Sequence, residues 1–184
     1  ATTIEIDLEL GGSDFAGEPS IRKLIIKDNG YGIDFYKLDN KFKPFYDSEK
    51  ALMDIEDRHH STLHGKNGIG RLAFSAFANQ AKWTTIFRSN GKKRLKYDIT
   101  ISDEKVGEYS PSDLYETKDN TGTIVEFSKF KRLRSHNSGY KPLFNALLNY
   151  LIRAFGWYLE LHKEQNFQIF LNGKPLEYYK NIND

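Results

Sequence analysis

The chain has 184 residues, with 27 Lys and Arg against 25 Asp and Glu, so its formal net charge is +2. Hydrophobic residues make up 39 % and aromatic residues 14 %, a composition that excludes a disordered chain. Because there is no cysteine, a disulfide scaffold, a thiolate metal site and a cysteine nucleophile are excluded as well. A net charge this small does not by itself indicate nucleic acid or a membrane as partner.

The length fits a single domain over 1–184. Neither an apolar run of about 20 residues nor a signal peptide is present, so we expect a cytoplasmic protein without a membrane partner. The first residue is Ala1, and residues 2–9 already alternate apolar and acidic side chains as a strand does. A domain that opens inside a strand is expected to be a fragment of a longer protein, whose downstream domain would be one partner.

In chain order, a second strand is predicted at 21–27, and it leads directly into an acidic, glycine-rich turn at 28–32. The segment 33–64 is mixed and highly charged, and 48–57 within it could form a short helix. A second glycine-rich motif follows at 65–70. A helix is then predicted over 71–79, with a buried face made of small and apolar side chains: Leu72, Ala73, Ala76 and Phe77.

The second half begins with a predicted β-hairpin, whose strands 83–88 and 95–101 flank an Asn-Gly turn. A polar loop is expected at 102–121 and a strand at 122–127. The longest helix is predicted over 142–162, because Pro142 suits a first turn and apolar residues follow at helical spacing. Its expected buried face comprises Leu143, Leu147, Tyr150, Leu151, Ala154, Tyr158 and Leu161.

Trp157 and Tyr158 on this helix are interpreted as core residues. A last strand is predicted within 167–174, where Asn172-Gly173 forms a turn. Strands outnumber helices and several are joined by hairpins. The predicted fold class is therefore α+β, with a mixed, largely antiparallel sheet and the helices packed on one face.

Asp28-Asn29-Gly30-Tyr31-Gly32 places a carboxylate and two glycines at the end of a strand. Glycines allow the backbone to approach a flat ligand closely, and a carboxylate can accept a hydrogen bond from an exocyclic amine such as that of adenine. An ordinary tight turn has the same composition. This motif taken alone therefore leaves both interpretations open.

Gly65-x-x-Gly68-x-Gly70 stands directly before a predicted helix. The backbone N–H groups of such a turn can bind anionic oxygens. The glycine order differs from the dinucleotide-binding fingerprint, and no Lys-Ser or Lys-Thr follows as in a P-loop. A plain flexible loop remains an alternative for this motif as well.

Thr121-Gly122-Thr123 opens the strand at 122–127. The three motifs in this order resemble the GHKL ATPases, which include DNA gyrase B, the ninety-kilodalton heat-shock chaperones, histidine kinases and MutL. The resemblance covers roughly residues 1–130 and is closer to the chaperone-like and MutL-like branch. It implies a Bergerat-type two-layer sandwich that binds ATP with Mg²⁺.

The resemblance also implies roles for individual residues. Asp28 would accept a hydrogen bond from the adenine amine, Thr123 would share an ordered water beside the base, and Gly30 and Gly32 would shape the turn below it. The segment 33–64 occupies the place of the family's mobile lid. The phosphates would be wrapped by the second motif, namely Gly65, Lys66, Gly68, Ile69, Gly70 and Arg71.

One feature of the family has no counterpart in this chain. In the family, a helix before the first strand carries the Glu that orients the attacking water and the Asn that holds Mg²⁺. Here that helix would lie before residue 1, so no catalytic residue and no metal ligand are assigned within 1–184. The intact parent is expected to couple ATP hydrolysis to lid closure and a conformational change, with a homodimer as one arrangement.

Three alternative functions stay open. A histidine-kinase catalytic domain would pass the phosphoryl group to a histidine, although the size and the second motif count against it. A degenerate member would serve only as a scaffold. A nucleic-acid module would use a basic stretch with interleaved aromatics: Phe127, Lys129, Phe130, Lys131, Arg132 and Arg134. His59, His60 and His64 are interpreted as solvated side chains rather than a metal site.

Overall fold

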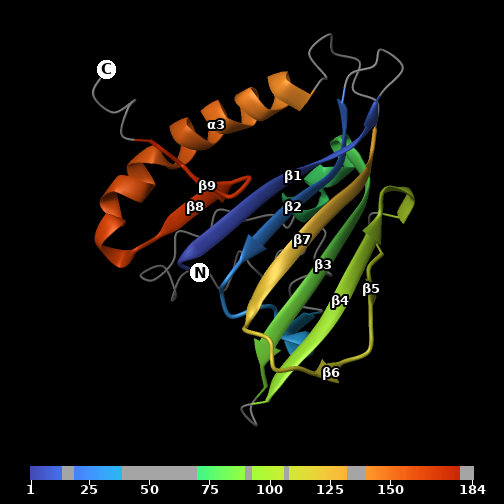
Figure 1. Ribbon diagram of the computed structural model, residues 1–184. Coiled ribbons are helices and arrows are strands. Elements are labelled where there is room, and N and C mark those ends of the chain that lie inside the picture. The colour runs from blue at the N-terminus through green and yellow to red at the C-terminus, as the bar shows by residue number, and fades with distance from the viewer. Residues whose placement is uncertain (14–18, 39–69, 90–92, 106–107, 132–139, 179–184) are drawn as a thin grey trace, which may run out of the picture.

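The computed structural model describes residues 1–13, 19–38, 70–89, 93–105, 108–131 and 140–178 (Figure 1). In this part of the chain, nine strands form one sheet in the order β5-β4-β3-β7-β2-β1-β8-β9, and β6 also pairs with β4. The longer strands are β1 (Thr3–Ser13), β2 (Pro19–Asp28), β3 (Ala78–Arg88), β4 (Arg94–Ser102), β7 (Gly122–Phe130) and β8 (Gln168–Leu171). The two-residue strands are β5 (Ser110–Pro111), β6 (Tyr115–Glu116) and β9 (Lys174–Pro175).

One α-helix, α3 (Tyr140–Leu161), is described, and it connects β7 to β8. The remaining helical turns are 3₁₀: η1 (Phe35–Lys37), η2 (Gly70–Ala76), η3 (Asp103–Lys105) and η4 (Lys163–Gln165). β8 pairs with β1 in parallel, whereas the other described strand pairs are antiparallel. The mixed, largely antiparallel sheet is therefore confirmed.

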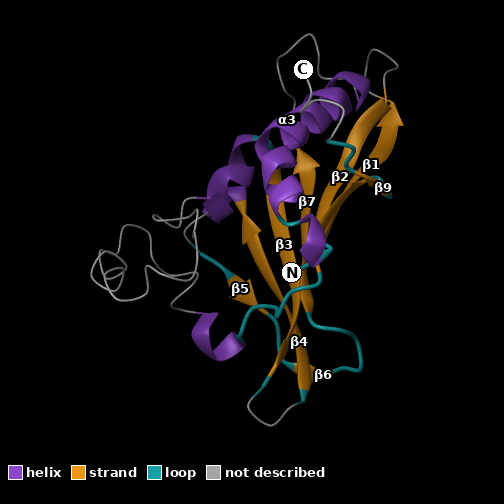
Figure 2. Cartoon of the chain, turned by 90° about the vertical axis from the view of Figure 1, so that its left-hand side faces the viewer, coloured by secondary structure: helices purple, strands orange, loops and turns teal. Residues whose placement is uncertain are grey.

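The two faces of the sheet differ in polarity because successive strand residues point to opposite sides. Directly opposed residues across five strands form one apolar row: Ile6, Ile26, Val125, Trp83 and Ile99. Helical elements cover this face, and in Figure 2 α3 lies to the left of β1 and β2. The α+β two-layer architecture with helices on one face is confirmed.

Two hydrophobic clusters fill the covered face. One lies over β3 and β4 and includes Phe74 of η2, with Trp83 and Tyr97 below it. The other joins Leu151 and Leu159 of α3 to β1 and β8. Each cluster therefore anchors one helical element to its own half of the sheet.

Two predicted elements were wrong in part. The helix expected over 71–79 is the short 3₁₀ turn η2, because the chain from Ala78 onward joins the sheet and pairs with β7 opposite Phe130. Ala73 and Ala76 are exposed, and Phe74 is buried instead. The polar loop expected at 102–121 contains η3 and the two short strands β5 and β6, which pair with the outer edge of β4.

The buried face predicted for the long helix was also partly wrong. Leu151 is buried as expected, but Tyr150, Trp157, Tyr158 and Leu161 are exposed large hydrophobic residues. The helix is apolar around much of its circumference, so helical spacing by itself does not indicate which side faces the sheet.

Candidate functional site

The acidic turn lies at the end of β2, on the covered face of the sheet. Asp28 is opposite Thr123 of β7, Thr123 is opposite Thr85 of β3, and Thr85 is opposite Tyr97 of β4. Because directly opposed residues in antiparallel strands share a face, these four side chains form a polar row continuous with the apolar core. The fold thus brings together Asp28 and Thr123, two predicted adenine-site residues that are 95 positions apart in the chain.

The Asp28 carboxylate is partly committed to its own turn. One oxygen accepts a hydrogen bond from the Gly30 backbone N–H at 2.7 Å, as in an Asx turn. Within the described residues, the structure gives the other oxygen no hydrogen-bond partner. A half-buried carboxylate with one oxygen available is suited to accept a hydrogen bond from a ligand amine.

Two buried hydroxyl groups, those of Thr85 and Thr123, hold Ile33, the residue that follows the turn. The Ile33 N–H donates to the Thr85 hydroxyl at 2.8 Å, and this hydroxyl lies 3.2 Å from that of Thr123. The Tyr97 hydroxyl donates to the Ile33 carbonyl at 3.0 Å. Burial, with Asp34 and Tyr109 nearby, raises the pKa of Tyr97 above its ordinary value, so this hydroxyl stays a proton donor.

Two glycines bring main chain against main chain at this site. Gly32 has φ of 72°, and a Cβ there would lie 2.1 Å from the Ile86 carbonyl oxygen. Gly122 has φ of 151°, and its Cβ would lie 2.2 Å from the Asp28 carbonyl oxygen. A side chain at position 32 would push the turn away from β3, and a side chain at position 122 would push β7 away from β2. Gly32 of the first motif and Gly122 of the third are thus required by the close approach of the backbone.

Asn29 ties the turn to the first strand. Its side-chain oxygen accepts hydrogen bonds from the Thr2 and Thr3 N–H groups at 2.8 and 3.0 Å, and its amide donates to the Thr2 hydroxyl at 2.9 Å. Sequence reasoning missed this role, as it missed Thr85. The period-two pattern of β3 would have found Thr85, because it places this residue on the same face as Trp83 and Phe87.

The second glycine motif is only partly within the described residues. Gly70 opens η2 and Arg71 follows in the same turn. Outside the described residues lie Gly65, Lys66, Gly68 and Ile69, most of the predicted lid segment 33–64, and the three histidines His59, His60 and His64. Leu38 and Phe74, on either side of 39–69, are buried in the same hydrophobic cluster.

In the described part of the basic stretch, Lys129 is exposed whereas Lys131 already has partners. The Lys131 ammonium pairs with Asp103 at 2.6 Å and donates to the Ser75 carbonyl. Phe127 packs into the core over β3, and the ring of Phe130 lies against another phenylalanine of that region. Arg132 and Arg134 lie outside the described residues.

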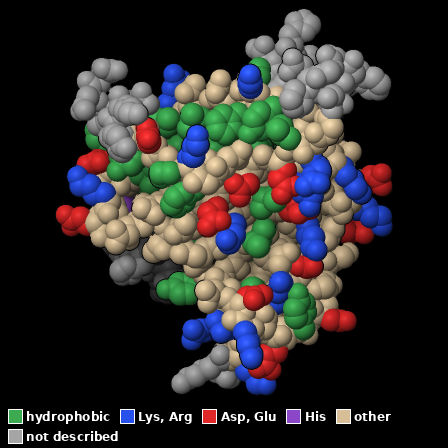
Figure 3. Space-filling view, in the orientation of Figure 1, with side chains coloured by type: hydrophobic (Ala, Val, Ile, Leu, Met, Phe, Trp, Pro, Cys, Tyr) green, Lys and Arg blue, Asp and Glu red, His purple; other side chains and the backbone are tan. Residues whose placement is uncertain are grey.

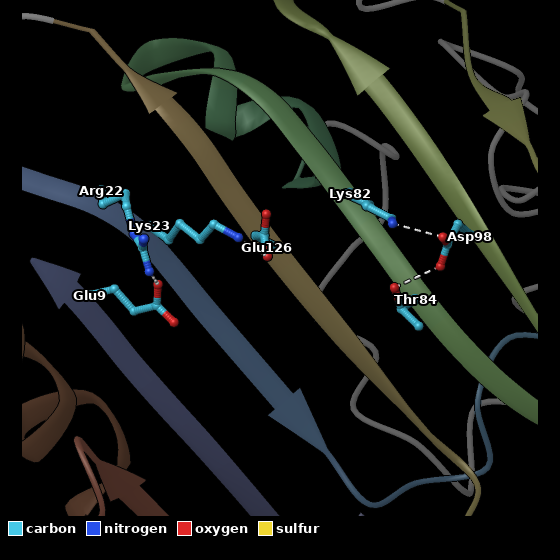
Figure 4. Close-up of polar contacts among 7 residues, drawn as sticks. All are labelled: Glu9, Arg22, Lys23, Lys82, Thr84, Asp98 and Glu126. Carbon is cyan, nitrogen blue, oxygen red and sulfur yellow. Dashed lines mark hydrogen bonds and ion pairs between the residues drawn. The ribbon is translucent and has the colours of Figure 1, made fainter. Parts of the chain in front are cut away.

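The uncovered face of the sheet carries charges that compensate one another (Figure 4). Arg22 pairs with Glu9 at 2.6 Å and Lys23 with Glu126 at 2.7 Å. Lys82 pairs with Asp98 at 2.7 Å, and the Thr84 hydroxyl donates to the same carboxylate. Alternating charges across five strands leave little net field for an anionic partner on this face.

Among the described residues, no cluster of three or more potential metal-ligating side chains is present. No helix in the described part of the chain has the length and apolar character needed to cross a membrane.

Comparison with curated proteins finds no match for this chain. A family model described as histidine kinase-, DNA gyrase B- and HSP90-like ATPase matches residues 1–132, which is more than half of the chain and contains all three glycine motifs. The chain therefore belongs to the family of histidine kinase-, DNA gyrase B- and HSP90-like ATPases.

Proposed function

We propose that the chain is an ATP-binding domain and that adenine binds at the end of β2, beside Asp28. The observation that carries the proposal is the polar row on the covered face, in which Asp28 is opposite Thr123 and the Thr123 hydroxyl contacts the buried Thr85 hydroxyl. The close backbone approach at Gly32 holds the turn after β2 directly against the main chain of β3 at Ile86. These residues fit a planar base with an exocyclic amine.

The same arrangement discriminates between purines. The Asp28 carboxylate only accepts hydrogen bonds, so it matches the exocyclic amine of adenine. Guanine presents a carbonyl oxygen at the equivalent position, which would place two acceptors against each other. A site built on one hydrogen bond rejects a ligand that cannot complete it, so GTP should bind much more weakly. Thr123 would hold a water between its hydroxyl and the base.

The phosphates would lie toward the second glycine motif, at Gly65, Lys66, Gly68, Ile69, Gly70 and Arg71. Mg²⁺ would reach the site on the nucleotide and reduce the negative charge of the phosphates. The segment 33–64 is proposed as a lid, and the shared burial of Leu38 and Phe74 supports this because both flanks of 39–69 are held in one cluster. A lid that contacts the terminal phosphate would favour ATP over ADP and thereby shift a conformational equilibrium in a larger protein.

The test is calorimetric titration of Mg-ATP, Mg-ADP and Mg-GTP into the protein and into Asp28→Asn. The asparagine variant presents a donor amide to the adenine amine, and we expect affinity for ATP and ADP to fall by about 10- to 100-fold. Asp7→Asn is the matched control, since Asp7 lies opposite Ile25 on the uncovered face of the same sheet. Equal ATP binding by wild type and Asp28→Asn, or no nucleotide binding by the folded protein, would refute the proposed site.

A further inference from the structure

The side of α3 that faces away from the sheet carries a row of exposed apolar residues. Tyr150 is 66 %, Trp157 65 % and Leu161 77 % exposed, and they follow one another at intervals of seven and four residues. Ala146 and Ala154 lie on the same side at helical spacing and are also exposed. Figure 3 shows the hydrophobic side chains in green gathered along α3 at the upper edge of the molecule.

This row is not an extension of the core. Leu151 and Leu159, which bind α3 to the sheet, lie on the opposite side of the helix. From residue 142 to residue 159 the helix contains one charged side chain, Arg153, which borders the exposed row. Arg153 has no ionic partner in the described part of the chain. An apolar face of this kind on a surface helix indicates a contact with another macromolecule.

We propose that this face, the outer row of α3, binds the same face of a second copy of the chain, with the two helices antiparallel. The twofold axis would pass between residues 155 and 156. In that register Ala154 lies opposite Trp157 of the second copy, so a small residue faces the largest one twice. Tyr150 lies opposite Leu161 of the second copy, again twice. This alternation of small and large side chains lets the two helices interdigitate.

The charges agree with the same register. Arg153 lies opposite Tyr158 of the second copy. Glu160 of that copy is two residues further along, which is about 3 Å along the helix axis. The two residues lie on the same side of the apolar row, so each Arg153 meets a carboxylate across the interface. Glu160 already binds Lys163 at 2.6 Å and the Tyr178 hydroxyl, but two carboxylate oxygens can accept more than two hydrogen bonds.

The area that the row can bury fits a weak dimer. Tyr150 and Trp157, at about 150–250 Å² each and two-thirds exposed, contribute roughly 200–330 Å² per chain, and the smaller residues of the row bring this to about 400–550 Å². A symmetric pair would bury about 800–1,100 Å², the size of a weak or transient interface. We therefore expect a dimer that dissociates measurably on dilution.

A cysteine crosslink tests the geometry, since the chain has no native cysteine to interfere. In the proposed register two copies of position 154 are about 4.5 Å apart along the axis, whereas two copies of position 146 are about 28 Å apart. Ala154→Cys should therefore give a covalent dimer with a short thiol-reactive linker, and Ala146→Cys should not. Equal crosslinking at both positions, or at neither, would overturn the proposed contact.

Sedimentation analysis over about 1 µM to 1 mM tests the association itself. The wild type should show a concentration-dependent dimer and Trp157→Glu a monomer. At concentrations where the wild type is monomeric, the two proteins should have the same thermal unfolding, because Trp157 lies outside the core. Leu10→Glu, at an exposed leucine of β1, is the matched control and should still dimerise. A wild type that stays monomeric throughout, or a Trp157→Glu protein that dimerises normally, would disprove the interface.

Charge reversal distinguishes a second copy from any other occupant. Arg153→Glu and Glu160→Lys should each dimerise poorly, because like charges then meet across the twofold axis. A mixture of the two variants pairs opposite charges at both ends, so it should form heterodimers in preference to either homodimer. Absence of that preference would show that the two helices do not meet in this register.

Discussion

Replacing Thr85 with valine should loosen the turn after β2 without changing the shape of the core. The Thr85 side chain is 0 % exposed, and valine has nearly the same volume. Its hydroxyl accepts from the Ile33 N–H at 2.8 Å and lies 3.2 Å from the Thr123 hydroxyl. The substitution therefore leaves a main-chain donor and a second hydroxyl without this partner.

The expected cost follows from these contacts. A buried donor left without a partner costs about 1–3 kcal/mol, and the weaker contact to Thr123 adds to it. The extra methyl group of valine returns about 0.8 kcal/mol through apolar burial. The free energy of unfolding should thus fall by about 1–3 kcal/mol. For a domain of this size the Tm should fall by roughly 2–12 °C.

Urea denaturation followed by tryptophan fluorescence measures the change, with Thr84→Val as the matched control. The Thr84 hydroxyl lies on the other face and donates to Asp98, which keeps its bond to Lys82 when the hydroxyl is removed. The control should stay within about 0.5–1 kcal/mol of wild type. A Thr85→Val protein as stable as the control would refute the inference that this hydroxyl holds the turn.

Three further predictions concern single residues. Gly32→Ala should lower the free energy of unfolding by about 1–3 kcal/mol in chemical denaturation, because its φ of 72° and the 2.1 Å approach to a β3 carbonyl leave no room for a Cβ. Gly12→Ala is the control and should change this free energy little, because nothing lies within 4 Å of the added Cβ. Tyr97→Phe should lose about 1 kcal/mol in the same assay, because a main-chain carbonyl loses its donor. Burial raises the pKa of Asp98, but hydrogen bonds led by that from Lys82 outweigh it and leave the pKa below its ordinary value. The stabilisation from ionised Asp98 is fully present above the ordinary carboxyl pKa and is lost as the pH falls through the lower pKa of the folded protein. Between neutral pH and about pH 3, the free energy of unfolding should therefore fall less in Asp98→Asn than in wild type, by a difference below about 1 kcal/mol.

The strand and turn at the proposed adenine site could be predicted from the sequence because their signals are local. A run of apolar residues ending in Asp28, followed by two glycines, indicates a strand and its turn without any knowledge of neighbours. The strand after Gly122 is recognised in the same way. Thr85 lies in a strand whose other buried residues are apolar, and its hydroxyl acquires a role only when β7 is placed beside β3.

The helical elements show the opposite case. Helical spacing predicted α3 to within two residues, but it assigned Tyr150 and Leu161 to the core because apolar residues surround much of the helix. The expected helix after Gly70 was shortened by the sheet, since pairing of Ala78 with β7 forms main-chain hydrogen bonds that a longer helix would lose.

By itself, then, the sequence determined the longer strands of the described sheet, the position of the turn after β2, and the family of ATPases to which the order of the three motifs points. The tertiary structure alone decided which strands lie side by side, and thereby which polar residues meet Asp28 and which side of α3 remains exposed. The physical reason is that turns and strand patterns depend on backbone conformation and neighbouring residues, whereas burial and hydrogen-bond partners depend on segments distant in the chain.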